Sequence, residues 1–277
     1  MKITMAKHAG YCYGVQRALK MAREATERSS KPIHTLGPII HNPQVVEALE
    51  QQGVNAVGSV DEVTEGTIII RTHGVDPKIM DIAKDRGLEV VDATCPFVAK
   101  AQDKAAKLIA DGRDVIIVGE RNHPEVAGLL ACAANRAVVV ENAEELEGLS
   151  DMEAVGVVVQ TTQSIENLRS VVDGLLDKTK ELIVYNTICS ATSQRQSAAA
   201  ELAGSVDMML VVGGKNSANT TRLNIICKER NRRTHHIETA DEIEAAWLEG
   251  VGNVGITAGA STPDWILKEV IDYLESG

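Results

Sequence analysis

Apolar and polar positions alternate along this chain in two patterns, and each pattern predicts a different kind of element. Short runs of Val, Ile and Leu predict buried strands, at residues 33–36, 67–71, 88–92, 114–118, 155–159, 182–185, 208–212 and 253–257. Apolar residues three and four positions apart predict helices, at about 13–28, 97–110 and 191–203. Further helices are expected to begin near Pro43, Pro77, Pro124 and Pro263, since proline fits a first helical turn. Strands that alternate with helices indicate an α/β fold with mainly parallel sheets.

One arrangement of elements occurs three times in the chain. A strand ends in a cysteine and a helix begins at once, at Cys12, Cys95 and Cys189. Each repeat continues with a strand, a glycine-containing turn, a helix start, a second strand and a helix. The helix starts have the form Ser/Thr/Asn-x-x-Glu of a capping box, at residues 59–62, 142–145 and 239–242. The third repeat lacks a final strand, and the N-terminal segment supplies it.

The sequence therefore predicts three α/β units whose boundaries are the cysteines. The units are residues 14–95, residues 96–189, and residues 190–277 completed by the N-terminal strand in residues 1–13. If a pseudo-threefold axis relates these units, the three cysteines meet on it. Each cysteine then lies between a strand end and a helix N-terminus, where loops carry the sites of α/β folds.

The composition mainly excludes classes of protein. A net charge of −11 argues against a nucleic-acid surface, because such surfaces are basic. No apolar run approaches the roughly 18 residues of a membrane span, and the N-terminal residues lack the apolar region of a signal peptide. We therefore expect a cytoplasmic protein that binds neither nucleic acid nor membrane. One basic segment, KERNRR at 228–233, is typical of a solvated helix end; the alternative is a docking patch for an acidic electron carrier.

Five cysteines in a chain that we expect to be cytoplasmic favour metal binding or catalysis over a disulfide framework. Cys132 and Cys227 lie in apolar helical patterns, and we expect both in the core, because unpaired cysteine behaves as a small hydrophobe. The three repeated cysteines suit a zinc ion with an open coordination position. They equally suit an iron–sulfur cluster in which one iron has no protein ligand. The plainer alternative is three small apolar residues at repeated core positions.

Polar residues occupy equivalent turns of the three repeats: His41, His73, His123, Ser217, Asn219 and Ser261. Such side chains at helix N-termini favour phosphate, and the scarcity of lysine and arginine among them fits an enclosed anion site better than an open phosphate groove. Taken singly, each is a helix cap or an ordinary histidine. Glu125 lies two residues after His123. It is a proton donor beside an open metal, with Thr161 nearby, or a first-turn glutamate favoured by the helix dipole.

The motifs GYCYGVQRA, GPIIHNP, RTHG, DATCP, ERNHPE, QTTQS, NTIC, KNSANT and GASTPDW occur in this order along essentially the whole chain. As a set they closely resemble the LytB family of reductases. These enzymes reduce hydroxymethylbutenyl diphosphate to isopentenyl and dimethylallyl diphosphate at the end of the non-mevalonate isoprenoid pathway. The resemblance implies three α/β units around a central four-iron, four-sulfur cluster. It also implies an allylic diphosphate as the substrate and a ferredoxin- or flavodoxin-type protein as the electron donor.

Site residues follow from the resemblance, position by position. The cluster ligands match Cys12, Cys95 and Cys189, which leaves one iron open. The residues that hold the diphosphate match His41, His73, His123, Ser217, Asn219 and Ser261, with Ala218 where relatives often have a second serine. We expect Glu125, Thr161 and His123 to act in catalysis, with Glu125 feeding the proton. The sequence leaves open whether Thr161 or Thr162 faces the substrate, and Thr161 is preferred.

Two other functions use the same three cysteines. One is a zinc-dependent hydrolase, and the other is a non-catalytic iron–sulfur sensor. A sensor needs no diphosphate pocket, and metal analysis separates the hydrolase from the reductase. The segment AKHAGY before Cys12 also departs from the Asn-Pro-Arg-Gly-Phe of many relatives.

Overall fold

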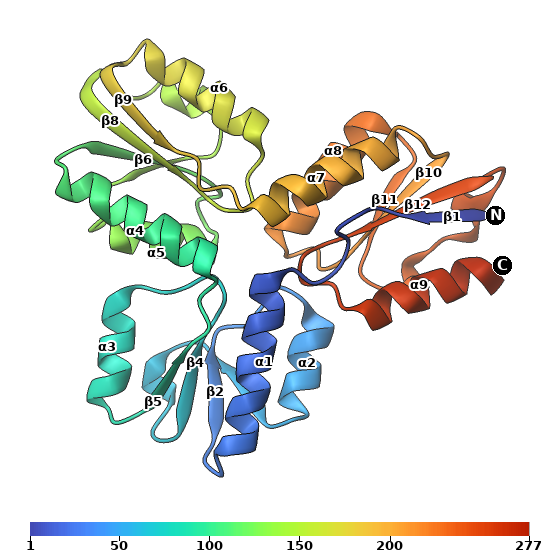
Figure 1. Cartoon of the computed structure of the whole chain (residues 1–277), viewed down its shortest axis with the longest axis horizontal. Helices are drawn as coiled ribbons and strands as arrows, with labels where there is room; N and C mark the ends of the chain where they lie inside the picture. Colours follow the sequence, from blue (N-terminus) through green and yellow to red (C-terminus); the bar gives the residue numbers. More distant parts are fainter. Residues whose placement is uncertain (277) are drawn as a thin grey trace. The chain divides into compact units, whose positions relative to one another are not determined.

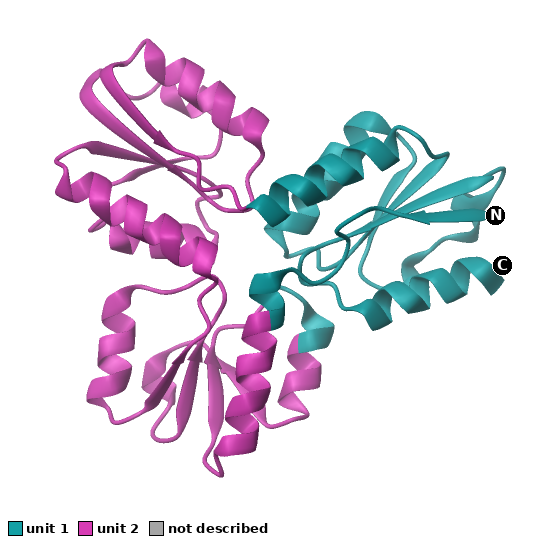
Figure 2. Cartoon of the chain, in the orientation of Figure 1, with its two compact units in different colours: residues 1–16, 41–45, 190–277 teal, residues 17–40, 46–189 magenta. Residues whose placement is uncertain are grey.

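The computed structural model describes residues 1–276, and Figure 1 traces their helices and strands along the chain. The twelve strands of these residues form three four-stranded sheets, and every neighbouring pair of strands is parallel. Contacts divide the chain into two compact units (Figure 2). Unit 1 is residues 1–16, 41–45 and 190–277, and unit 2 is residues 17–40 and 46–189. The α/β class with parallel sheets is confirmed, whereas the division at the three cysteines stays a prediction.

Unit 2 contains two of the sheets. The first has the order β3-β2-β4-β5, from strands Ile33–Leu36 (β2), Val54–Val57 (β3), Thr67–Ile70 (β4) and Glu89–Asp92 (β5). The second has the order β7-β6-β8-β9, from Asp114–Val118 (β6), Val138–Val140 (β7), Met152–Val159 (β8) and Thr179–Tyr185 (β9). The connecting helices are Tyr13–Arg28 (α1), Pro43–Glu50 (α2), Pro77–Asp85 (α3), Pro96–Ala110 (α4), Pro124–Cys132 (α5) and Ile165–Leu176 (α6). The first residues of α1 and α2, up to residues 16 and 45, belong to unit 1.

Unit 1 contains the third sheet, whose order is β1-β12-β10-β11. Its strands are Lys2–Met5 (β1), Met208–Val212 (β10), Thr234–Ile237 (β11) and Asn253–Ala258 (β12), and its helices are Ser190–Ala203 (α7), Ala218–Arg230 (α8) and Asp264–Ser276 (α9). The N-terminal strand β1 runs parallel to β12, with Ile3 opposite Val254. The prediction that the N-terminus completes the third sheet is therefore confirmed.

The central strands are largely apolar on both faces because helices cover both faces of each sheet. In β6, Val115 and Ile117 pack against α4 and α5, whereas the alternate residues Ile116 and Val118 pack against α6. Strand β10 follows the same rule, with Met208, Leu210 and Val212 in one cluster with α9 and the residues between them in another with α7 and α8. Among the described residues, no helix is both long and apolar enough to cross a membrane.

The structure departs from the sequence predictions at several edges. Strands β3, β7 and β11 were not predicted, and β8 and β9 begin earlier than expected, at Met152 and Thr179. Cys227 is buried as predicted, whereas the prediction that Cys132 lies in the core is wrong, because its side chain is only partly buried at the end of α5.

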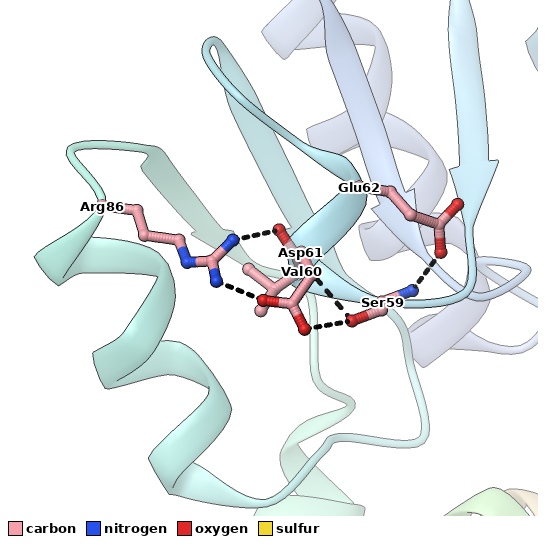
Figure 3. Close-up of polar contacts among 5 residues, drawn as sticks. All are labelled: Ser59, Val60, Asp61, Glu62 and Arg86. Atoms are coloured by element: carbon pink, nitrogen blue, oxygen red, sulfur yellow. Dashed lines mark hydrogen bonds and ion pairs between the residues drawn. The ribbon is translucent and has the colours of Figure 1, made fainter.

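The three predicted helix starts are single 3₁₀ turns, and they are not equivalent. The first has a full capping box. Ser59 Oγ accepts a hydrogen bond from Asp61 N at 3.1 Å, and Glu62 Oε1 accepts one from Ser59 N at 2.7 Å (Figure 3). Arg86 reinforces this turn through the Val60 carbonyl and the Asp61 carboxylate. At the third turn Thr239 makes no side-chain cap, so the predicted capping box is absent there.

Candidate functional site

The backbone around each repeated cysteine is fixed in the same way. The cysteine N–H donates a hydrogen bond to a carbonyl in the loop that follows the neighbouring central strand, and this loop lies in the same unit as the cysteine. The three pairs are Cys12 N to Ala260 O at 3.2 Å, Cys95 N to Thr72 O at 2.9 Å, and Cys189 N to Thr161 O at 3.1 Å. The repeat seen in the sequence is therefore also a repeat of local geometry.

The loops before Cys95 and Cys189 share a second feature. Asp92 Oδ1 accepts a hydrogen bond from Thr94 N at 2.9 Å, and Asn186 Oδ1 accepts one from Ile188 N at 3.2 Å. Each is an Asx turn, in which a short polar side chain bonds the backbone two residues on. The turn ends the strand and directs the chain to the cysteine. This signal is present in the sequence as DATC and NTIC, and our sequence analysis did not use it.

All three cysteine side chains are partly exposed, and none forms a disulfide. Cys95 occupies the N-cap position of α4 without making a side-chain cap, and Pro96 at the first helical position needs no N–H partner. The sulfur of Cys95 is therefore not used in helix capping. Soft thiolate ligands suit zinc and iron–sulfur clusters, and this donor set fits an iron–sulfur cluster with three cysteine ligands.

Glu125 and Thr161 form a buried pair in unit 2. Glu125 lies in the first turn of α5 and is only 1 % exposed. Its Oε1 accepts a hydrogen bond from Thr161 N at 2.6 Å, and its Oε2 accepts one from Thr161 Oγ1 at 2.9 Å. Burial raises the pKa of the Glu125 carboxyl from 4.5 to about 7, and the two bonds from Thr161 oppose this rise without cancelling it. The carboxyl can therefore hold a proton near neutral pH.

His123 lies directly before this pair, at the N-cap of α5. Its Nδ1 accepts a hydrogen bond from Glu125 N at 3.1 Å. An imidazole whose Nδ1 accepts a hydrogen bond carries its proton on Nε2. The His73 ring lies edge-on to it, with the ring centroids 5.3 Å apart. The structure thus brings together His73, His123, Glu125 and Thr161 in unit 2.

Gln160 forms a hydrogen bond with Thr162, the neighbour of the threonine that contacts Glu125. Its side chain is fully buried; its Nε2 donates to Thr162 Oγ1 at 2.9 Å and its Oε1 accepts from Glu120 N at 2.8 Å. The Thr162 hydroxyl is therefore bonded to Gln160, whereas Thr161 bonds Glu125. Which of the two threonines faces the substrate stays a prediction, and the structure adds Gln160, which the sequence predictions did not assign.

The remaining predicted binding residues lie in unit 1. Ser217 is the N-cap of α8, and its Oγ accepts from Thr220 N at 3.4 Å. Asn219 follows in the first turn and is 4 % exposed, and neither polar atom of its side-chain amide has a partner among the described residues. Because buried polar groups are normally hydrogen-bonded, this amide is available for a ligand. Ala218 between them is also buried and has no polar side-chain group to offer.

The loop at His41 packs beside this helix start within unit 1. Ser261 Oγ donates to His41 O at 2.9 Å. A Cβ on Gly214 would come within 2.9 Å of the same carbonyl, so the chain needs glycine at this close approach. Lys215 is exposed and forms an ion pair with Glu242.

Comparison with known proteins covers nearly all of the chain. A family model described as "LytB protein" matches residues 3–275. A curated relative from Geobacter sp. (strain M21), named 4-hydroxy-3-methylbut-2-enyl diphosphate reductase, is 53 % identical over 277 residues, which cover 100 % of this chain and 98 % of the relative. A relative from Geotalea uraniireducens (strain Rf4) has the same name and is 51 % identical over 275 residues, with 99 % and 97 % covered.

Two solved structures agree with these sequence matches. One is described as (E)-4-hydroxy-3-methyl-but-2-enyl diphosphate reductase, the terminal enzyme of the non-mevalonate pathway. It is 45 % identical, with a TM-score of 0.74 and 100 % of both chains covered. The other is the E-1-hydroxy-2-methyl-but-2-enyl-4-diphosphate reductase from Plasmodium falciparum. It is 28 % identical, with a TM-score of 0.93, and the match covers 99 % of this chain and 87 % of that one.

Proposed function

The chain belongs to the LytB family, and on that premise we propose how it acts as a 4-hydroxy-3-methylbut-2-enyl diphosphate reductase. The reaction removes the allylic hydroxyl of this diphosphate and gives isopentenyl and dimethylallyl diphosphate, the last step of the non-mevalonate isoprenoid pathway. Curated relatives that are about half identical to this chain, over nearly their full length, are named as this reductase. Their names support the reductase rather than the zinc hydrolase or the iron–sulfur sensor.

The cofactor in this proposal is a four-iron, four-sulfur cluster held by Cys12, Cys95 and Cys189. When bound, the cluster supplies the electrons and, at the iron without a protein ligand, a Lewis acid for the allylic hydroxyl. Two properties of the cysteines support the assignment. Their thiols are partly exposed and outside disulfides, and their amides are held by the same hydrogen bond in each repeat.

Glu125 is the proton donor in this proposal, and its geometry is the observation that carries it. A carboxyl with a pKa of about 7 is protonated in a large fraction of molecules at neutral pH, which suits a general acid. Thr161 fixes both of its oxygens. The proton passes from Glu125 to the leaving hydroxyl, which departs as water, and the Thr161 hydroxyl orients the substrate.

The diphosphate is bound by imidazole, hydroxyl and amide groups rather than by lysine or arginine. In our proposal these groups belong to His41, His73, His123, Ser217, Asn219 and Ser261. The unpartnered side-chain amide of Asn219 supplies a donor that carries no full charge. Ala218 leaves the first turn of α8 one hydroxyl short of the usual family pattern, so one phosphate hydrogen bond is either missing or made by a backbone N–H at this helix start.

The electron donor in this proposal is a ferredoxin- or flavodoxin-type protein, and the enzyme acts in the cytoplasm. The basic segment at 228–233 is a poor docking site for this donor. It lies at the C-terminal end of α8, whose thirteen residues rise about 1.5 Å each, so it is about 20 Å from the binding residues at the helix start. Arg233 there bonds the carbonyls of Trp247 and Glu249, which is the role of a solvated helix end.

The first experiment is a metal analysis of protein purified without oxygen. The proposal requires close to four irons and four sulfides per chain with little zinc, followed by turnover of the allylic diphosphate with an artificial one-electron donor. One zinc and no sulfide per chain would refute the cluster. A full set of iron and sulfide without turnover would refute the substrate and retain the cluster.

A further inference from the structure

Two charged side chains differ from the others in being buried. Among the aspartates, glutamates, lysines and arginines that the structure describes, only Glu125 and Arg195 are buried. Glu125 already has a role as the proton donor. Arg195 is 2 % exposed and lies in α7, the helix that begins directly after Cys189. Because burying a charge is costly, a role for this guanidinium is to be expected.

Arg195 holds the loop that carries Cys12. Its Nη2 donates a hydrogen bond to Gly10 O at 2.6 Å, and Gly10 is two residues before Cys12. Gly10 has a φ of +87°, which a residue with a side chain rarely adopts. The standard dimensions of the backbone place the guanidinium within about 10 Å of the Cys12 Cα. The buried charge is therefore close to a proposed cluster ligand.

Arg17 makes the corresponding contact at Cys95. It lies in α1, the helix that begins directly after Cys12. Its Nη1 donates to Thr94 O at 3.1 Å and its Nη2 to Asp92 O at 3.4 Å. The Thr94 oxygen belongs to the peptide group that joins Thr94 to Cys95, and the N–H of the same group donates to Thr72 O. This peptide group is thus held at both ends.

The helix after the remaining cysteine has a weaker counterpart. Lys104 of α4 lies over the ring of Tyr185, 4.6 Å from its centroid, and Tyr185 is four residues before Cys189. Each helix that follows a cysteine therefore directs a cation toward the segment that leads to another cysteine. This recurrence is a property of all three repeats, and no motif of the sequence analysis included it.

We propose that Arg195 and Arg17 are positioning residues for the cluster, which fix the Cys12 and Cys95 loops and make the cluster easier to reduce. This inference rests on the proposed function, because it requires the cysteines to be ligands. Three thiolates give the bound cluster negative charge, and each reduction adds more. A nearby guanidinium stabilises the more negative state, because net charge and hydrogen bonding tune the reduction potential of such clusters.

The test is the midpoint potential of the bound cluster, measured by a redox titration followed by electron paramagnetic resonance. Arg195→Gln and Arg17→Gln remove the charge, Arg195→Lys keeps it, and Arg23→Gln removes an exposed charge from the same helix as Arg17. In Arg195→Gln and Arg17→Gln we expect the equilibrium between reduced and oxidised cluster to shift about tenfold toward the oxidised state. For a one-electron couple this lowers the midpoint potential by about 59 mV. The midpoint potential should change less in Arg195→Lys, and it should not change in Arg23→Gln.

The outcomes separate this inference from the proposed function. If the unsubstituted chain binds no iron and sulfide, the proposed function fails. If it binds both and the glutamine variants keep its potential and its spectrum, the role of the arginines is refuted. If Arg195→Gln does not fold, Arg17→Gln decides alone, because its side chain is partly exposed and its loss leaves no buried cavity. A shift equal to that of Arg23→Gln would also overturn the inference, because it would show an effect of total charge only.

Discussion

Replacement of Glu125 by glutamine should change how the stability of the protein depends on pH. The substitution keeps the size of the side chain and makes it neutral at every pH. The glutamine Oε1 can still accept from Thr161 N, and the Thr161 hydroxyl can rotate to accept from the new amide. The hydrogen bonds around the site therefore persist, and the loss of the titrating carboxyl is the main change.

The magnitude follows from the pKa of the buried carboxyl. Its pKa is about 7 in the folded chain against 4.5 ordinarily, so between these values the folded state binds more protons than the unfolded state. The free energy of unfolding then falls as pH rises, by about 1.4 kcal/mol per pH unit and about 3 kcal/mol in total. The stabilisation is complete below pH 4.5 and is lost by about pH 7. Glu125→Gln removes this dependence.

The assay is urea unfolding of the cluster-free chain under reducing conditions between pH 4.5 and 8. The difference between Glu125→Gln and the unsubstituted chain should grow by about 3 kcal/mol in favour of the variant across this range. Glu144→Gln, at an exposed position, is the matched control and should show no comparable change. Parallel curves for Glu125→Gln and the unsubstituted chain would refute a raised pKa. With the cluster bound, the variant should lose about 10²- to 10⁴-fold in turnover.

Three other substitutions give separable results. Cys95→Ser should lose the four-iron spectrum while Cys132→Ser, also at a partly exposed thiol, keeps it; an intact spectrum in Cys95→Ser would disprove ligation there. Asn219→Ala should raise the KM for the diphosphate by about tenfold or more, with Thr221→Ala on the same helix as the control, and an unchanged KM would exclude Asn219 from binding. Gly66→Ala should destabilise the protein by at least about 2 kcal/mol, since its φ is +98° and a Cβ would lie 2.1 Å from Pro32 O. Gly148→Ala meets nothing within 4 Å and should be nearly neutral in the same thermal or urea unfolding experiment.

The central strands and most helices could be predicted because their cause is local. Runs such as DVIIV in β6 are apolar on both faces, and the proline at the start of α3, α4 or α5 fixes a helix start. The missed strands β3, β7 and β11 have three or four residues, and in each at least one residue is not buried. Such edge strands are made by pairing with a neighbour, and a single-sequence pattern does not contain that pairing.

Motifs could name the residues of the proposed site, but they could not predict the contacts of these residues. Motifs placed Glu125 and Thr161 near the ends of strands β6 and β8, 36 residues apart, and only the fold shows the two hydrogen bonds between them. Arg195 gave no usable signal, because it lies among small and polar residues in a helix without a clear apolar face. Its burial results from packing against a loop 185 residues away in the sequence.

Thr161 joins two parts of the proposed chemistry through a single peptide segment. Its N–H and hydroxyl hold the Glu125 carboxyl, and its carbonyl accepts the N–H of Cys189. The proposed proton donor and a proposed cluster ligand are thus attached to the same residue, and the fully buried side chain of its neighbour Gln160 bonds Thr162 and Glu120. A displacement of this loop would move the proton source and a ligand together. In the proposed mechanism, the proton donor and a cluster ligand therefore depend on the same short segment of backbone.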